Sequence, residues 1–179
     1  MAKNRNIVLL KTTDDLKDEV SYNEFEYKDK FIHLCNLIPN KDKEKLDIEF
    51  VDENSIKNNG MVYIFVIDEK IFKIGHTITT ITKRVQSYNC GKTEYRIAGT
   101  NSTTNYFVLQ SLLNIGEIVE DYAFFTEKPE YKVSGKAYKD GAQPAKKAEN
   151  IIITDFIKNH SKNQLATHKL RIKNESISN

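Results

Sequence analysis

The chain has 179 residues, a formal net charge of +2 and 39% hydrophobic residues. This length suits one compact core with terminal additions and is short for two domains. The apolar runs fall well below the ~18 residues of a membrane span, the N-terminus lacks a secretory apolar core, and Cys35 and Cys90 lack zinc-site or disulfide spacing. We therefore expect a soluble, cytoplasmic protein with no membrane partner and with reduced cysteines.

The charges are unevenly distributed along the chain. Residues 11–53 carry 13 acidic and 7 basic side chains, whereas residues 57–110 carry 7 basic and 3 acidic ones and residues 128–147 carry 6 basic and 2 acidic ones. Basic segments attract a polyanion, so this distribution favours a nucleic acid facing the central and C-terminal parts. The alternative is that the lysine-rich loops are simply solvated.

Residues 1–59 are interpreted as an N-terminal addition that packs on the core. Apolar residues recur at helical spacing from Phe25 to Ile38, and Pro39 would end that helix. Two runs rich in Val, Ile, Phe and Tyr follow, at residues 61–67 and 71–75, and residues 68–70 are interpreted as a three-residue loop between them. This pattern predicts a β-hairpin.

The rest of the core, residues 60–160, alternates between helical and strand patterns. We expect helices over about 80–88 and 105–114, a strand over 118–126, an exposed basic loop over 128–143 and a last helix over 144–159. A basic tail would occupy residues 161–179. The predicted fold is α+β, a small three-stranded antiparallel sheet flanked by helices, with additions at both ends. The last helix would bury Ala148, Ile151, Ile152 and Phe156.

The predicted hairpin brings chemistry-bearing residues together. With a three-residue loop, Tyr63 faces Gly75, and Lys73 is the diagonal neighbour of Tyr63 on the same face of the sheet. A two-residue turn would instead point Lys73 to the opposite face. Gly75 would leave open space in which a backbone phosphate approaches.

The helix after the hairpin adds a cation to this cluster. Arg84 and Tyr88 are four residues apart and share one helix face, so Arg84 can point toward the hairpin and stabilise a phosphate. Tyr63 is a poor base at its ordinary pKa near ~10, and we expect nearby Lys73 and Arg84 to lower that pKa. His76 is a second group that could relay a proton.

A phosphodiester-cleaving site also calls for a divalent metal, which needs a carboxylate. Among the acidic residues of the core, Glu149 is chosen because it lies one turn into the last helix and can face inward. A single carboxylate favours Mg²⁺ held with several waters. The residues expected to contact DNA are Lys132, Lys136, Lys139, Gln143, Lys146 and Lys147.

The segment resembles the core of the GIY-YIG endonuclease superfamily over roughly residues 60–157. Met61-Val62-Tyr63 corresponds to the first motif and Lys73-Ile74-Gly75 to the second, with Arg84 on the next helix and Glu149 on the last. Lys73 replaces the usual second-motif tyrosine. Tyr88 stands where many members have a histidine.

The small size and the terminal additions look like the restriction-endonuclease branch. The resemblance implies a type II enzyme that cleaves double-stranded DNA at a specific sequence. Tyr63 would act as general base, Lys73, His76, Arg84 and Tyr88 would assist, and Glu149 would hold one Mg²⁺ per active site. Cutting both strands favours a homodimer. The alternatives are a non-catalytic DNA-binding module and a repair or mobile-element nuclease of the same superfamily.

Overall fold

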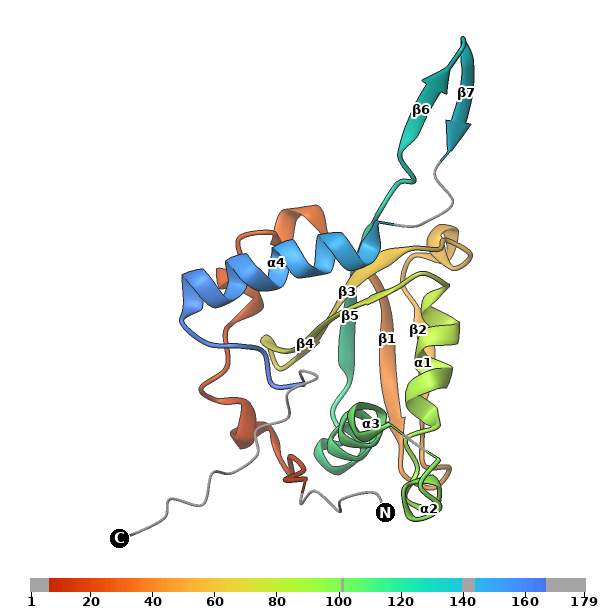
Figure 1. The fold of residues 1–179 in the computed structure, drawn as a ribbon. Helices are drawn as coiled ribbons and strands as arrows, with labels where there is room; N and C mark the ends of the chain where they lie inside the picture. Colours follow the sequence, from red (N-terminus) through yellow and green to blue (C-terminus); the bar gives the residue numbers. More distant parts are fainter. Residues whose placement is uncertain (1–6, 101, 140–143, 167–179) are drawn as a thin grey trace, which may run out of the picture.

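The protein is described by a computed structural model that covers residues 7–100, 102–139 and 144–166 (Figure 1). The strands are β1 Ile32–Asn40, β2 Lys45–Phe50, β3 Met61–Ile67, β4 Lys70–Thr77, β5 Val119–Phe125, β6 Glu130–Val133 and β7 Lys136–Lys139. The helices are α1 Ile81–Asn89, α2 Thr93–Ile97, α3 Thr103–Ile115 and α4 Ala145–His160. Short 3₁₀ turns lie at Thr13–Leu16, Tyr22–Glu24, Lys28–Lys30 and Glu53–Ser55. No helix in these ranges is long and apolar enough to cross a membrane.

The central sheet has five strands in the described part of the chain, in the order β2-β1-β5-β3-β4. All of its pairings are antiparallel. The α+β class is therefore confirmed, but the prediction of a three-stranded sheet is wrong. The two additional strands, β1 and β2, come from the segment that was expected to pack on the core as an addition.

Strand β1 lies where the sequence predicted a helix, and a β-bulge explains the error. The pairing of β1 with β5 shifts register between His33 and Cys35. Leu34 and Cys35 are consequently both buried although they are adjacent, and Leu37 is buried as well. Together with buried Phe31, these residues imitate the i, i+3, i+4 spacing of a helix.

The β3–β4 hairpin has the predicted register at the site but a different turn. Asp68 and Glu69 form a two-residue turn in which both residues have positive φ, 48° and 60°, as a type I′ turn requires. A bulge between the pairs Phe65–Lys73 and Val66–Ile71 then adds one residue on β4. The bulge compensates for the short turn, so the predicted pairing of Tyr63 with Gly75 is confirmed while the three-residue loop is wrong.

Helices cover both faces of this sheet. Alternate β3 residues, including Tyr63 and Phe65, join a core with α1 and α3, whereas Val62 and Ile64 join a second core with α4. Every residue of β3 is buried as a result. In α4, Ile152 and Phe156 face the sheet as predicted, but Ile151 is 52% exposed, because it lies on the outward side of the helix.

The segment predicted as a long basic loop is a second, two-stranded sheet. Strands β6 and β7 pair through a turn in which Ser134 and Gly135 have positive φ. The hairpin projects away from the body of the molecule (Figure 1). The described side chains of its strands are exposed. Each strand has only four residues, the shortest run over which alternation indicates a strand, so the sequence gives only a weak strand signal here.

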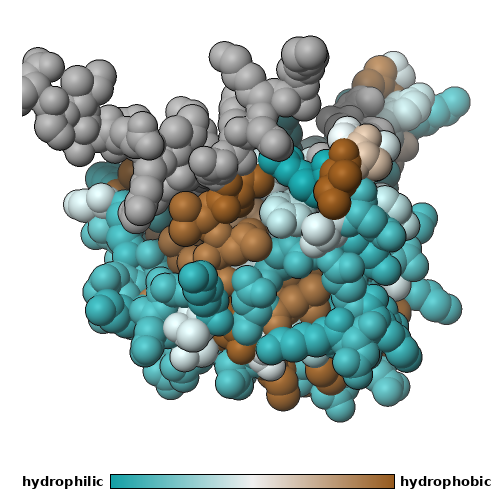
Figure 2. All heavy atoms as spheres, turned by 90° about the horizontal axis from the view of Figure 1, so that it is seen from below, coloured by the Kyte–Doolittle hydropathy of each residue, from teal (hydrophilic) through white to brown (hydrophobic). Residues whose placement is uncertain are grey.

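The face seen from below Figure 1 lies at the other end of the molecule from this hairpin. Hydrophilic residues cover most of it, and hydrophobic residues gather in smaller areas toward its middle (Figure 2).

Candidate active site

Tyr63 lies in the middle of the sheet, between two small residues. It pairs with Gly75 on β4 and with Ala123 on β5. A Cβ atom added at Gly75 would lie 2.4 Å from both Cζ and Oη of Tyr63. The expectation that Gly75 leaves open space for a phosphate is therefore wrong, because the ring of Tyr63 occupies that space.

Helix α1 brings a guanidinium onto this phenol. Its N-cap is Thr80, whose side chain accepts a hydrogen bond from the backbone of Lys83. Arg84 Nε donates to Tyr63 Oη at 2.9 Å, and Arg84 Nη2 donates to Tyr88 Oη at 2.9 Å. The two hydroxyl oxygens are 2.5 Å apart. Tyr63, Arg84 and Tyr88 thus form one hydrogen-bonded cluster.

Burial dominates the electrostatics of this cluster. It raises the pKa of Tyr63 above the usual range, and the charge of Arg84 opposes that shift without cancelling it. Burial likewise raises the pKa of Tyr88. For Arg84, burial acts to lower the pKa, but the two phenol oxygens raise it, so the guanidinium stays protonated. Arg84 thus lowers the pKa of Tyr63 as expected, but burial outweighs it, so the pKa ends above and not below its ordinary value.

Lys73 lies on the same face of the sheet as Tyr63, because it pairs with Phe65 two residues along β3. Its side chain is only 4% exposed, and Nζ donates to the backbone carbonyl of Ala166 at 2.7 Å. Burial, helped by the charge of Arg84, lowers the pKa of Lys73 to about 8. A lysine that titrates near neutrality can exchange a proton under physiological conditions.

His76 and Glu149 form a second group on the α4 side of β4. His76 Nδ1 lies 2.6 Å from Glu149 Oε2. His76 pairs with Val62, whose side chain belongs to the α4 core, while Tyr63 and Lys73 face α1 and α3. The two groups are close enough to interact, since the charge of Glu149 acts to raise the pKa of Lys73.

The acidic residue of this group suits a hard cation. Within the described ranges, no three His, Cys, Asp or Glu side chains gather as a metal cage. Glu149 makes its one described hydrogen bond through Oε2, which leaves Oε1 as a further oxygen donor. Mg²⁺ fits such a site, because it is usually held by one or two carboxylates and completes its shell with waters and phosphate oxygens.

Most of the lysines expected to contact DNA lie at the end of the sheet where this site is found. Met61 pairs with both Thr77 and Phe125, so β5 leaves the sheet beside Tyr63 and His76 and leads into the β6–β7 hairpin. Gln143 lies outside the described residues. Exposed lysines on the hairpin and in the first turn of α4 are Lys132, Lys136, Lys139, Lys146 and Lys147.

Comparison with solved structures decides the family. One match is the restriction endonuclease HPY188I, solved in complex with product DNA, which is 58% identical to this chain with a TM-score of 0.72. The alignment covers 94% of this chain and 98% of the HPY188I chain. The chain belongs to the GIY-YIG endonuclease superfamily. A mutant of bacteriophage T4 EndoII is 17% identical and shares the fold with a TM-score of 0.54. That alignment covers 75% of this chain and 91% of the EndoII chain. No protein-family model and no curated protein matches the chain.

Sequence reasoning missed two residues of this GIY-YIG endonuclease that touch the site from the C-terminal segment. Gln164 hydrogen-bonds the backbone of Ile74, and Ala166 accepts the hydrogen bond of Lys73. Both residues were assigned to a basic tail. Their local sequence carries no periodic signal, and their contacts join residues about ninety positions apart.

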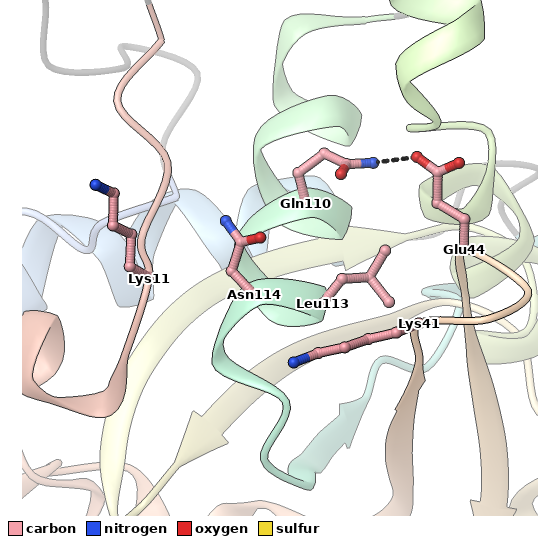
Figure 3. Close-up of a pocket in the computed structure, with 6 residues that line it drawn as sticks. All are labelled: Lys11, Lys41, Glu44, Gln110, Leu113 and Asn114. Atoms are coloured by element: carbon pink, nitrogen blue, oxygen red, sulfur yellow. Dashed lines mark hydrogen bonds between the residues drawn. The ribbon is translucent and has the colours of Figure 1, made fainter.

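A pocket of about 540 Å³ lies elsewhere on this endonuclease. It opens between the N-terminal segment, the β1–β2 turn and α3, and Gln110 donates to the Glu44 carboxylate at 2.7 Å on one side of it (Figure 3). Tyr63, Arg84 and Tyr88 do not line this pocket, so the pocket is separate from the candidate active site. The lining residues are Lys11, Lys41, Glu44, Gln110, Leu113 and Asn114.

Proposed function

We propose that this protein is a type II restriction endonuclease that cleaves both strands of double-stranded DNA at a specific sequence with a divalent metal. The observation that carries the proposal is the cluster in which Arg84 joins Tyr63 and Tyr88, with Lys73 on the same sheet face and Glu149 across β4. The related restriction endonuclease at 58% identity supports the same activity.

Tyr63 is the proposed general base for the attacking water. Its phenolic proton must leave first, and Lys73, whose pKa is about 8, is the proposed acceptor on the same face. The sheet register puts the two residues at diagonal positions on the same face, with their β-carbons roughly 7 Å apart. Tyr88 and Arg84 hold the phenol oxygen in a fixed position from the other side.

Arg84 is the proposed stabiliser of charge on the scissile phosphate. Its guanidinium is half-buried and remains protonated, which suits a group that must meet a dianionic transition state. A planar guanidinium can keep two phenol partners and still offer a further N–H to phosphate oxygens.

Glu149 is the proposed ligand of one Mg²⁺ per site, and His76 orients the carboxylate through its 2.6 Å contact. The metal, when bound, neutralises charge on the leaving oxygen. Removing the carboxylate charge while keeping its shape therefore weakens metal binding directly. Glu149→Gln is the matching variant.

The proposed DNA contacts are made by the exposed lysines of the β6–β7 hairpin and of the first turn of α4. Lys139 also forms an ion pair with Glu130 at 2.8 Å, so Lys132 and Lys136 are the less encumbered of the hairpin cations. Because the hairpin leaves the sheet beside Tyr63, a duplex gripped by the hairpin would pass the site. Gln143 stays a proposed base contact.

A cleavage assay on long duplex DNA tests the proposal. The wild-type chain should yield discrete fragments with Mg²⁺ and none with excess chelator. Glu149→Gln should lose at least ~100-fold in rate, the scale of a lost transition-state charge interaction. The control is the Glu117→Gln variant, which should cleave DNA at the wild-type rate. Glu117 is an exposed carboxylate just before the first residue of β5, at the end of the strand away from the site. Bound but intact DNA with the wild type would favour a binding module, and fragments without discrete sizes would favour a repair-type nuclease.

A further inference from the structure

Strand β4 is an edge strand whose outer side is covered by two short segments. At the turn end, Tyr22 donates its backbone N–H to Glu69 at 2.7 Å, and Ile71 donates to Val20 at 2.9 Å. Beyond that point, residues 162–166 follow the edge. We name residues 162–166 the C-terminal strap. Covering an edge in this way satisfies backbone groups that would otherwise be left unpaired.

Gln164 fastens the strap to β4. Its side-chain amide imitates a peptide group: Oε1 accepts from the backbone N–H of Ile74, and Nε2 donates to the carbonyl of Ile74 at 2.8 Å. The residue is only 5% exposed. A buried amide that meets both backbone groups of one residue fixes the strap in register with the strand.

A second anchor ties the strap to the N-terminal segment. Lys162 Nζ lies 3.3 Å from Glu19 Oε2 and donates a hydrogen bond to the carbonyl of Asp18. Glu19 is 8% exposed, while the side chain of Lys162 is 25% exposed, so the ion pair is partly buried. The strap is therefore held at both ends of its described length.

The last residue of the strap, Ala166, contacts Lys73 and its neighbour Phe72. Ala166 donates its N–H to Phe72 at 3.3 Å, and its carbonyl accepts from Lys73 Nζ at 2.7 Å. Among the described residues, no carboxylate lies within ion-pair distance of Lys73. Arg84 on α1 and Glu149 on α4 are the charged groups that act on it from the neighbouring elements.

We propose that the C-terminal strap is a positioning element of the active site, in which Gln164 sets the register and the Ala166 carbonyl holds the Lys73 amine beside Tyr63. This inference rests on the proposed endonuclease function. The β4 bulge turns Lys73 toward the Tyr63 face, and the strap closes the remaining side from the edge. Without the strap, water would reach Lys73 and its side chain would lose its fixed place.

The first test is the Gln164→Ala variant with Asn163→Ala, an exposed neighbour in the strap, as matched control. Single-turnover cleavage is measured over a pH series and over DNA concentration. We expect kcat to fall about 10- to 100-fold with KM unchanged, the scale of a misplaced catalytic group. The rising limb of the pH profile should move to higher pH, because a solvated lysine recovers its ordinary pKa. Asn163→Ala should match the wild type.

Three results of this assay would overturn the proposal. An unchanged kcat, or a lower kcat with an unmoved pH profile, would reduce the strap to a purely structural cover. A higher kcat would make it an inhibitory contact. Gln164→Met, which keeps the side-chain bulk without the amide, serves where Gln164→Ala does not fold, and the same outcomes apply to it.

A second measurement separates the strap from the endonuclease function. Side-chain ¹³C NMR of labelled lysines follows the titration of Lys73, assigned by its loss in Lys73→Met. The wild-type midpoint should lie near pH 8, and the Gln164 variants should shift it upward. This readout needs no cleavage. An inactive wild type would sink the proposed function, whereas an unshifted Lys73 midpoint in the variants would sink the strap.

Discussion

At the scale of single residues, Gly75 determines how closely β4 can approach Tyr63. The residue has no positive φ, so sterics and not backbone strain decide which side chain it tolerates. In Gly75→Ala, the added Cβ would meet the Tyr63 ring at 2.4 Å and push the phenol away from Arg84. We expect the free energy of unfolding to fall by about 1–3 kcal/mol, as in other overpacked cores.

The same displacement should also slow DNA cleavage, by about 100-fold for a shift near 1 Å. Urea unfolding gives the first quantity, and single-turnover cleavage of the folded variant gives the second. Tyr63→Phe is the comparison, because it removes the hydroxyl and leaves the ring in place. Wild-type cleavage by a folded Gly75→Ala protein would contradict the close packing of Tyr63 as a requirement.

Lys73 makes a second residue-scale prediction, about stability and pH. Its pKa is about 8 in the folded protein against an ordinary 10.5, so between these values the unfolded chain binds more protons than the folded one. The free energy of unfolding therefore rises with pH across this window. Below the window, the full cost of burying the charged amine lowers the free energy of unfolding. The total change is about 3 kcal/mol.

The comparison with Lys73→Met isolates this contribution. Wild type and variant are unfolded with urea over a pH series from neutral to alkaline. The wild type should gain on the variant as the pH rises from about 8 to 10.5, because only the wild type carries the buried amine. Lys83→Met, which removes an exposed lysine of α1, should run parallel to the wild type. Parallel curves for Lys73→Met would rule out a lowered pKa.

At the scale of elements, the β6–β7 hairpin should act as the electrostatic grip on DNA. The slope of log K against log salt is negative, and each phosphate contact that is lost reduces its magnitude by about 0.9. We expect Lys132→Ala with Lys136→Ala to weaken binding to specific and random DNA alike and to reduce that slope by up to twice this amount. Filter binding or fluorescence anisotropy at several salt concentrations measures both effects.

The control for the hairpin is a second pair of exposed lysines far from it. Lys41 and Lys43 lie in the β1–β2 turn, next to the beginning of β5, whereas the hairpin follows the end of β5. Lys41→Ala with Lys43→Ala removes the same charge and should leave the salt slope unchanged. Equal losses in both double variants would show that net charge, and not the hairpin, sets the affinity.

Elements with strong local signals are the ones that the sequence predicted well. Helix α3, strand β5 and the β3–β4 hairpin follow from periodicity and turn residues, and Arg84 meets Tyr63 because Arg84 and Tyr88 share a helix face. Strand β1 failed because its bulge imitates helical spacing. Residues Gln164 and Ala166 could not be found, because a polar segment that docks on a distant strand edge leaves no local pattern.

At the scale of the whole molecule, one chain offers one Tyr63 cluster in its described residues, and a cut in both strands needs two such sites. A two-fold dimer would supply them and would match a palindromic target. Mixing wild type with Tyr63→Phe tests this arrangement, since the variant keeps its ring packing against Phe65 and should still associate. Mixed dimers would then carry one active site each.

Supercoiled plasmid with one target site reports the outcome of the mixture. If two chains act together, the linear product should fall with the square of the wild-type fraction, and nicked circles should accumulate with the product of the two fractions. If single chains cut independently, the linear product should fall in simple proportion and nicked circles should not build up. Light scattering supplies the second check, because a dimer of this 20.7 kDa chain doubles the mass on DNA. A monomer mass together with proportional loss would contradict the homodimer.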